Sequence, residues 1–152
     1  MQDSRLATKG LVLLGCGKMG SAMLAGWLNR GLPPDAVSVI DPAPSDWLQS
    51  SGVRINGELP QSPAIVIVAV KPQMMSEALP VIGGYGGGDT LILTVAAGTP
   101  ISAYEGVFGD GTPIVRAMPN TPAAVGKGIT ALVGNSAATA MHLDQADELL
   151  SA

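Results

Sequence analysis

The sequence predicts an α/β fold in which helices cover both faces of a doubly wound, mainly parallel sheet. Short apolar segments alternate with segments whose apolar residues recur at helical spacing, as is typical of βαβ units. Hydrophobic residues make up 47% of the 152 residues but aromatic residues only 3%, so the core must be largely aliphatic. Such a composition suits parallel strands that are buried on both faces.

The expected elements follow from this alternation. Six segments are expected to be strands because they are apolar and bounded by turn residues: 10–15, 36–41, 64–70, 90–98, 112–118 and 128–134. Helical patterns cover 21–31, 44–52, 72–82 and 138–152. We expect Gly31 to end the first helix, Ser45 to cap the second and Pro80 to break the third.

Charge and composition exclude several classes of function. The formal net charge is −4, and the eight Lys and Arg residues are scattered, which argues against a nucleic-acid surface. The longest apolar run, 64–70, is far shorter than the roughly 20 residues that cross a bilayer. One cysteine allows neither an internal disulfide nor a cysteine-cluster metal site. The N-terminal segment has no apolar signal-peptide core, so we expect a cytoplasmic protein without a membrane segment.

A G-x-G-x-x-G pattern at Gly15, Gly17 and Gly20 directly follows the first strand and opens the first helix. In a dinucleotide-binding turn the first glycine permits the tight turn, the second lets the backbone approach a pyrophosphate, and the third lets helix and strand pack closely. The N–H groups at the helix start attract phosphate. The pattern therefore favours a Rossmann-type dinucleotide site, and the alternative is a purely structural turn. Within the turn, Lys18 is either a phosphate contact or a solvated side chain, and Cys16 either a reactive thiol or a small packing residue.

Asp41 ends the second strand, 21 residues after Gly20, which is the spacing of a carboxylate that binds the adenosine ribose. A carboxylate here would repel a 2′-phosphate, and no Arg or Lys lies between Asp41 and Arg54, so the pattern leans towards NAD. The alternative is that Asp41 only begins the turn formed by "DPAP".

The segments that follow three later strands should meet where the carboxyl ends of the strands lie. "AVKP" (69–72) follows the third strand, "AAG" (96–98) the fourth and "RAMPNTP" (116–122) the fifth. Lys71 is an orienting cation or a solvated lysine. Asn120 can donate to and accept from a carboxamide, as a nicotinamide site requires, or it can form an Asx turn. We find no nucleophile–base pair and no metal-ligand pattern, so no catalytic residue and no metal are predicted.

Several strings together resemble the pyrroline-5-carboxylate reductases in order and spacing, over nearly the whole chain. They are "GCGKMGSAMLAG" (15–26), "AVKP", "AAG" and "RAMPNTPAAVGKGITAL" (116–132). The resemblance implies reduction of 1-pyrroline-5-carboxylate, a cyclic imine, to L-proline with NADPH or NADH. It implies cofactor contacts from Gly15, Cys16, Gly17, Lys18, Met19, Gly20, Asp41, Pro42, Asn56, Ala69, Val70, Lys71, Pro72, Ala97 and Asn120. It also implies that Asn120 and Thr121 lie on the substrate side. Asn56 is identified by the resemblance alone.

This sequence departs from the family pattern in three respects. Lys18 stands where the family often has Asn, and Asp41-Pro42 replaces the Asn-Arg of many NADP-preferring members. The family also has a second, largely helical domain, which forms the dimer of a homo-oligomer and holds the substrate carboxylate. We therefore expect 1–136 to be the dinucleotide-binding domain and 137–152 a terminal helix leading to that absent domain, so that this chain binds cofactor but reduces little substrate. The alternatives are a hydroxyacid-dehydrogenase-type oxidoreductase domain and a non-catalytic dinucleotide-binding module.

Overall fold

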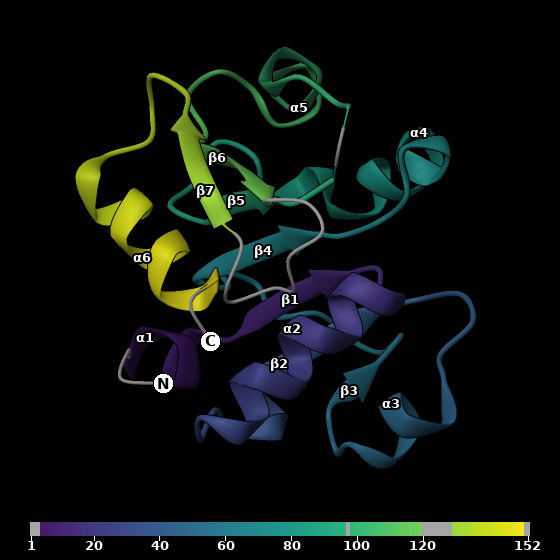
Figure 1. Cartoon of the computed structure of the whole chain (residues 1–152). Helices are drawn as coiled ribbons and strands as arrows, with labels where there is room; N and C mark the ends of the chain where they lie inside the picture. Colours follow the sequence, from purple (N-terminus) through teal and green to yellow (C-terminus); the bar gives the residue numbers. More distant parts are fainter. Residues whose placement is uncertain (1–3, 97, 120–128, 151–152) are drawn as a thin grey trace.

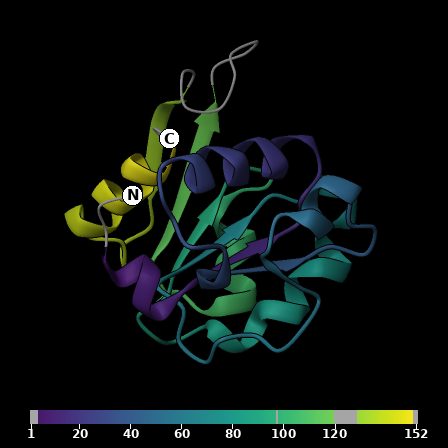
Figure 2. The ribbon, with the colours of Figure 1, turned by 90° about the horizontal axis from the view of Figure 1, so that it is seen from below.

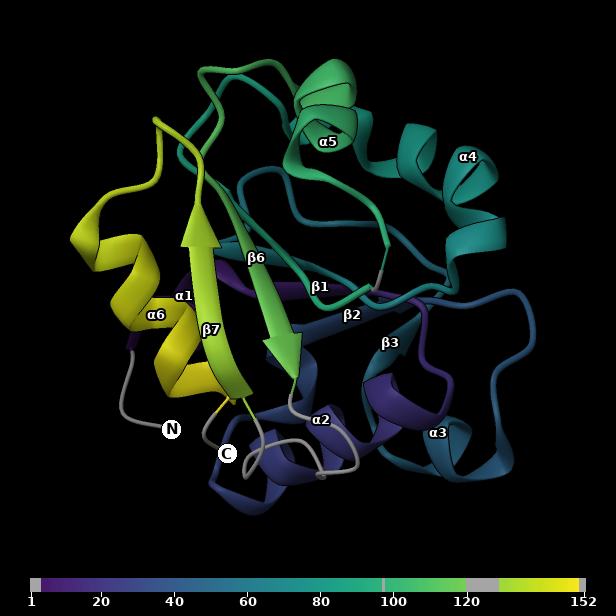
Figure 3. The same cartoon turned by 45° about the horizontal axis from the view of Figure 1, so that its top comes forward.

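The computed structural model describes residues 4–96, 98–119 and 129–150 and contains one seven-stranded sheet (Figure 1). The strand order is β3-β2-β1-β4-β5-β6-β7. Neighbouring strands are parallel throughout, except that β7 runs antiparallel to β6 at the edge of the sheet (Figure 3). The strands are β1 (Leu11–Leu14), β2 (Val37–Ile40), β3 (Arg54–Ile55), β4 (Ile65–Val68), β5 (Leu91–Thr94), β6 (Ile114–Pro119) and β7 (Ile129–Gly134).

Helices cover both faces of this sheet, so the predicted fold class is confirmed. The helices are α1 (Ser4–Lys9), α2 (Lys18–Asn29), α3 (Asp46–Ser50), α4 (Met75–Ala78), α5 (Ile101–Phe108) and α6 (Ala140–Leu150), with 3₁₀ turns at Pro34–Ala36, Pro72–Met74 and Leu79–Tyr85. The central strands β1, β4 and β5 are buried at every position, and alternate side chains enter two separate cores. One core lies under α2 and α6, and the other lies under α4 and α5 (Figures 1 and 2).

Local signals in the sequence set several element ends correctly. The Ser45 hydroxyl caps α3 by accepting the Leu48 N–H at 3.1 Å, and Gly31 follows the end of α2 with a φ of +98°. Pro80 interrupts the third predicted helix, which becomes short α and 3₁₀ turns. The sequence did not predict α1, β3 or α5. These elements are short, and β3 exists because two of its residues pair with the edge of β2.

The apolar stripe of α6 packs against the same core as α2. Ala146, Leu149 and Leu150 are buried there, and the Trp27 indole Nε1–H of α2 donates to the Leu149 carbonyl at 2.9 Å. The last carbonyls of a helix have no partner within the helix, so this bond satisfies one of them. Figure 2 shows α2 and α6 lying side by side. The bond thereby joins α2 to the end of α6.

Replacing Trp27 with phenylalanine should destabilise the fold. The substitution leaves the Leu149 carbonyl without its donor and opens space around a side chain that is 0% exposed. We expect the free energy of unfolding to fall by about 1–3 kcal/mol, measured by urea denaturation. Trp47→Phe is the matched control, because Trp47 is 42% exposed and should change the value by less than about 0.5 kcal/mol. Equal effects of the two variants would contradict the role of the Trp27 bond.

Candidate dinucleotide-binding site

A cleft of about 470 Å³ opens at the carboxyl end of β1. There β1 pairs with β2 on one side and with β4 on the other, so the connections leave it in opposite directions. Ligands of open α/β sheets bind at such a reversal of strand order. The cleft is lined by Leu14, Gly15, Cys16, Gly17, Ile40, Asp41, Pro42, Asn56, Ala69, Val70, Lys71, Met74, Glu77, Ala78 and Val81.

The three glycines of the motif differ in what a Cβ at each position would meet. Gly15 has a φ of +88°, and a Cβ there would lie 2.8 Å from the Val70 Cγ1 atom. A Cβ on Gly20 would lie 2.6 Å from the Gly15 carbonyl oxygen, so the third glycine permits the close packing of α2. A Cβ on Gly17 would meet nothing within 4 Å. The space beside Gly17 is open, as expected for backbone that a phosphate approaches.

The amino end of α2 presents unsatisfied donors beside this space. Gly17 is the N-cap and supplies no side-chain cap, and Ser21 is the first residue whose N–H reaches back to Gly17, at 2.9 Å. The three N–H groups before Ser21 therefore have no carbonyl partner within the helix. Together with the helix dipole they form an anion-binding end.

Asp41 lies at the end of β2 with its carboxylate turned to the glycine-rich turn. One oxygen, Oδ2, accepts the Cys16 N–H at 3.0 Å, and the other, Oδ1, accepts the Ala43 N–H at 2.8 Å. The residue is only 9% exposed. The structure is compatible with both interpretations of Asp41. The residue lines the cleft, as a ribose contact would, and its carboxylate also holds the turn at Ala43.

Asn56 lies directly after β3 and reaches the main chain of Asp41. Its Oδ1 accepts the Asp41 N–H at 2.9 Å, and its Nδ2 donates to the Asp41 carbonyl at 2.7 Å. Among the described residues, Asn56 alone combines a side chain with a positive φ, at +53°. Reasoning from residue types missed Asn56, although "NG" after a β-branched residue is a recognisable turn signal.

Cys16 is buried between two of the glycines and is not an activated thiol. Burial raises the pKa of the Cys16 thiol, the nearby Ser21 hydroxyl opposes this rise, and the Asp41 charge adds to it. The Cys16 Sγ lies 3.5 Å from the Ser21 Oγ. A raised pKa keeps the thiol protonated near neutral pH, which supports the packing interpretation and contradicts the low-pKa alternative.

The wall opposite Asp41 comes from the segment after β4. Ala69, Val70 and Lys71, three of the predicted cofactor contacts, line the cleft. Met74, Glu77, Ala78 and Val81 also line it and were not among the predicted contacts. Of the other predicted contacts, Lys18, Met19 and Pro72 are exposed beside the cleft without lining it, and Gly20 is buried beneath the turn. Ala97, Asn120 and Thr121 lie outside the described residues.

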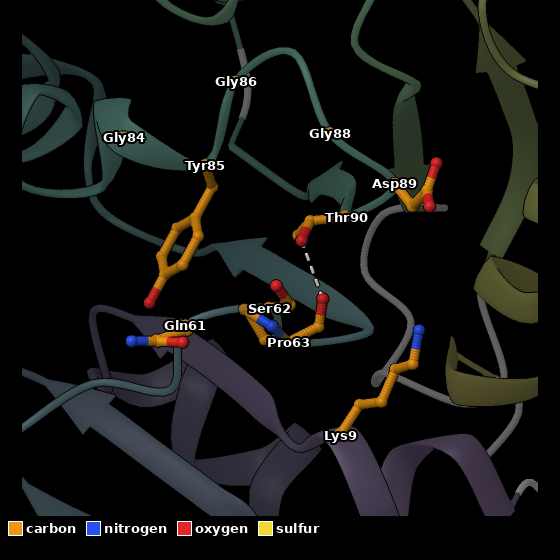
Figure 4. A pocket seen from close by; sticks show the side chains of 10 residues that line it. All are labelled: Lys9, Gln61, Ser62, Pro63, Gly84, Tyr85, Gly86, Gly88, Asp89 and Thr90. Atoms are coloured by element: carbon orange, nitrogen blue, oxygen red, sulfur yellow. Dashed lines mark hydrogen bonds between the residues drawn. The ribbon is translucent and has the colours of Figure 1, made fainter.

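A second hollow, of about 360 Å³, lies on the opposite side of the sheet from the cleft, at the amino ends of the central strands (Figure 4). Lys9, Pro63 and Thr90 line it, and they come just before β1, β4 and β5. The Thr90 hydroxyl donates to the Pro63 carbonyl at 2.7 Å, so this side chain is already engaged within the protein. The amino end of α2 and the reversal of strand order lie at the carboxyl ends of the strands, so the cleft at Gly15–Gly17 is the candidate dinucleotide site.

Two absences hold for the residues that the structure describes. Within them, no three His, Cys, Asp or Glu side chains come together as metal ligands. Within the same residues, none of the helices is long and apolar enough to cross a membrane.

The fold and the cleft have the architecture of a Rossmann-type dinucleotide-binding domain. The family model described as NADP oxidoreductase, coenzyme F420-dependent, matches residues 10–98, and the chain belongs to this family. Curated relatives named pyrroline-5-carboxylate reductase include the protein of Pseudomonas aeruginosa, which is 30% identical over 97% of this chain and 56% of its own length. The protein of Methanosarcina acetivorans is 34% identical over 91% of this chain and 54% of its own length.

These matches confirm the resemblance found in the sequence. The chain spans about half the length of the curated relatives it matches. A solved pyrroline-5-carboxylate reductase from Coxiella burnetii superposes with a TM-score of 0.84 at 24% identity, over 95% of this chain and 56% of that chain. The Plasmodium falciparum pyrroline carboxylate reductase, solved with NADP bound, gives a TM-score of 0.78 at 23% identity, over 95% and 55%. At these identities the two structures establish the fold.

The substitutions Gly17→Ala and Gly20→Ala should distinguish a residue needed for dinucleotide binding from one needed for folding. Gly20→Ala should lower the free energy of unfolding by about 1–3 kcal/mol, because the new methyl group overlaps the Gly15 carbonyl. Gly17→Ala should lower it by less than Gly20→Ala does, because the new Cβ meets no atom within 4 Å. The same Cβ occupies the phosphate side of the cleft, so Gly17→Ala should bind dinucleotide more weakly. Urea denaturation and a fluorescence titration measure the two effects, and normal binding by Gly17→Ala would contradict the assignment.

The raised pKa of Cys16 predicts slow alkylation. The rate of reaction with iodoacetamide should rise with pH through a midpoint above about 8.5, the ordinary thiol value. The stability contributed by the protonated thiol is fully present below that ordinary value and is lost as the pH rises above it. A peptide spanning residues 12–20 is the control and should show the ordinary midpoint. A midpoint in the folded chain at or below that of the peptide would contradict the prediction.

Proposed function

We propose that this chain is the cofactor-binding domain of a pyrroline-5-carboxylate reductase, which reduces 1-pyrroline-5-carboxylate to L-proline with NADH or NADPH. The observation that carries the proposal is the open space at Gly17, beside the unsatisfied N–H groups of α2 and at the reversal of strand order. The relatives that bear the reductase name support the choice of substrate.

The residues of the cleft fit a dinucleotide. The turn from Gly15 to Gly20 and the start of α2 would hold the pyrophosphate through main-chain N–H groups. Ala69–Pro72 would flank the path towards the nicotinamide end, where the half-buried Ala69 and Val70 line the cleft beside the turn. When bound, the reduced nicotinamide supplies a hydride. The protein would then contribute mainly proximity and orientation, since a protonated cyclic imine is already electrophilic.

The adenosine end of the site is proposed to favour NADH. The Asp41 carboxylate would face the ribose with the acceptor capacity left by its two main-chain bonds, and Pro42 and Asn56 would complete this end. A negative charge at 9% exposure would repel the 2′-phosphate of NADPH.

The substrate side is proposed from the resemblance. Asn120 and Thr121 would lie there with Ala97 near the nicotinamide. We propose that residues 1–136 form the cofactor domain, and that 137–152 lead to a helical domain that binds the substrate carboxylate and forms a homo-oligomer. A cytoplasmic location stays a prediction from the sequence.

Ligand-dependent stability tests the proposal directly. NADH at about 100 times its dissociation constant should raise the free energy of unfolding by about 2.7 kcal/mol, because it binds only the folded chain. NADPH should need a higher concentration for the same effect, and Asp41→Asn should narrow this difference. Thermal unfolding with each cofactor measures both. Absence of stabilisation by either cofactor would overturn the proposed function, whereas tighter binding of NADPH would overturn only the assignment of Asp41.

A further inference from the structure

We propose that Asn56 is a positioning residue which, acting through Asp41, holds the glycine-rich turn in the shape that receives a pyrophosphate. The inference rests on the proposed function and adds a role for a residue that the resemblance assigns only to the adenosine end. Three chain segments take part: the turn at Cys16, the end of β2 at Asp41 and the residue after β3.

The first step is the contact between Asn56 and the main chain of Asp41. The Asn56 N–H donates to the Val39 carbonyl at 2.8 Å, so its backbone is the last rung of the β2–β3 pairing. Its side-chain amide then binds both the N–H and the carbonyl of Asp41, at 2.9 and 2.7 Å. The carboxamide thus continues the ladder by one residue in place of a third residue of β3. The φ of +53° turns the chain away at that point while the side chain stays over β2.

The second step leads from Asp41 to the turn. With its N–H and its carbonyl both bound, the Asp41 backbone is fixed, and its carboxylate accepts the buried Cys16 N–H at 3.0 Å. The neighbouring residue of β2 adds a second link, since the Ile40 carbonyl accepts the Gly15 N–H at 2.8 Å. Hydrogen bonds to a charged acceptor are stronger than neutral ones, so the Asp41 carboxylate is the stronger of the two links.

The third step concerns what the turn offers to a ligand. The Cys16 N–H points to the Asp41 carboxylate and is therefore unavailable to a phosphate. The open side of Gly17 and the unpaired N–H groups at the start of α2 remain for that purpose. If the Asp41 carboxylate moves, the Cys16 peptide loses its acceptor and can rotate, which misaligns the donors that follow it. Asn56 therefore controls pyrophosphate binding from a position directly after β3, a strand that does not itself touch the turn.

A glycine at position 56 tests this arrangement cleanly. Asn56→Gly removes the carboxamide, while a φ of +53° suits glycine, so the backbone keeps its conformation. Gln61→Gly is the matched control. It removes an exposed carboxamide from the same β3–β4 connection, but Gln61 lines the second hollow and not the cleft. Asn56→Asp is a second variant of nearly unchanged size, which can accept the Asp41 N–H but cannot donate to its carbonyl.

Ligands with and without a pyrophosphate give the decisive measurement. Asn56→Gly should weaken NADH, NADPH and ADP by a common factor of about ten, and should weaken adenosine, which carries no pyrophosphate, by a clearly smaller factor. Amide hydrogen exchange at Cys16 should accelerate in Asn56→Gly and Asn56→Asp without a matching change in exchange across the central strands. Gln61→Gly should behave as the unmodified chain in both measurements.

The outcomes distinguish this inference from the proposed function. Unchanged dinucleotide affinity in Asn56→Gly, with normal binding by the unmodified chain, would overturn the inference alone. Equal loss of ADP and adenosine affinity would also overturn it, because the whole effect would then lie at the adenosine end and none of it at the pyrophosphate. Failure of the unmodified chain to bind NADH, NADPH or ADP would overturn the proposed function and this inference together.

Discussion

The close approach of α2 to the end of β1 is the constraint on which the rest of the structure depends. The Gly20 Cα lies so near the Gly15 carbonyl that a Cβ would come within 2.6 Å of the oxygen. This contact lets the chain leave a fully buried strand and enter a helix within a few residues. It also aims the amino end of α2 at the point where the strand order reverses. A larger residue at position 20 would move the helix, and the cleft would move with it.

Two sets of contacts hold that geometry from opposite sides. On the core side, α2 is fixed by the buried Trp27, whose indole N–H satisfies a terminal carbonyl of α6. On the cleft side, the turn is fixed to β2 through the Ile40 carbonyl and the Asp41 carboxylate. The cleft itself contributes few bonds, and its open space at Gly17 exists because the surrounding elements are anchored elsewhere. Because the stabilising contacts lie in the core and at β2, the space at Gly17 can stay open without loss of packing in the fold.

Much of the fold could be predicted because its signals are local. The strand segments at β1, β2, β4 and β5, the helix α2, the Ser45 cap and the break at Pro80 all follow from composition, spacing or backbone sterics over a few residues. The elements that were missed, such as β3 and α5, have weak local signals and depend on their neighbours. In the cleft, Met74, Glu77 and Val81 were missed because the face that their helical turns present is set by packing against β4 and β5. Lys18 and Met19 lie within the motif, between Gly17 and Gly20. Their exposed side chains do not line the cleft, whereas their main-chain N–H groups are among the free donors at the start of α2.

The sequence by itself determined that a glycine-rich turn follows a buried strand, that a carboxylate ends the next strand, and that the chain resembles a particular reductase family. These are properties of residue type and spacing, which a tight turn and a parallel sheet restrict strongly. Only the tertiary structure decided what the Asp41 carboxylate and the Asn56 amide do, because their partners lie 25 and 15 residues away. Hydrogen bonds of a few ångströms between distant segments depend on how strands are ordered in the sheet. The turn could thus be foreseen from its glycines, whereas the contacts that hold it in place required the folded chain.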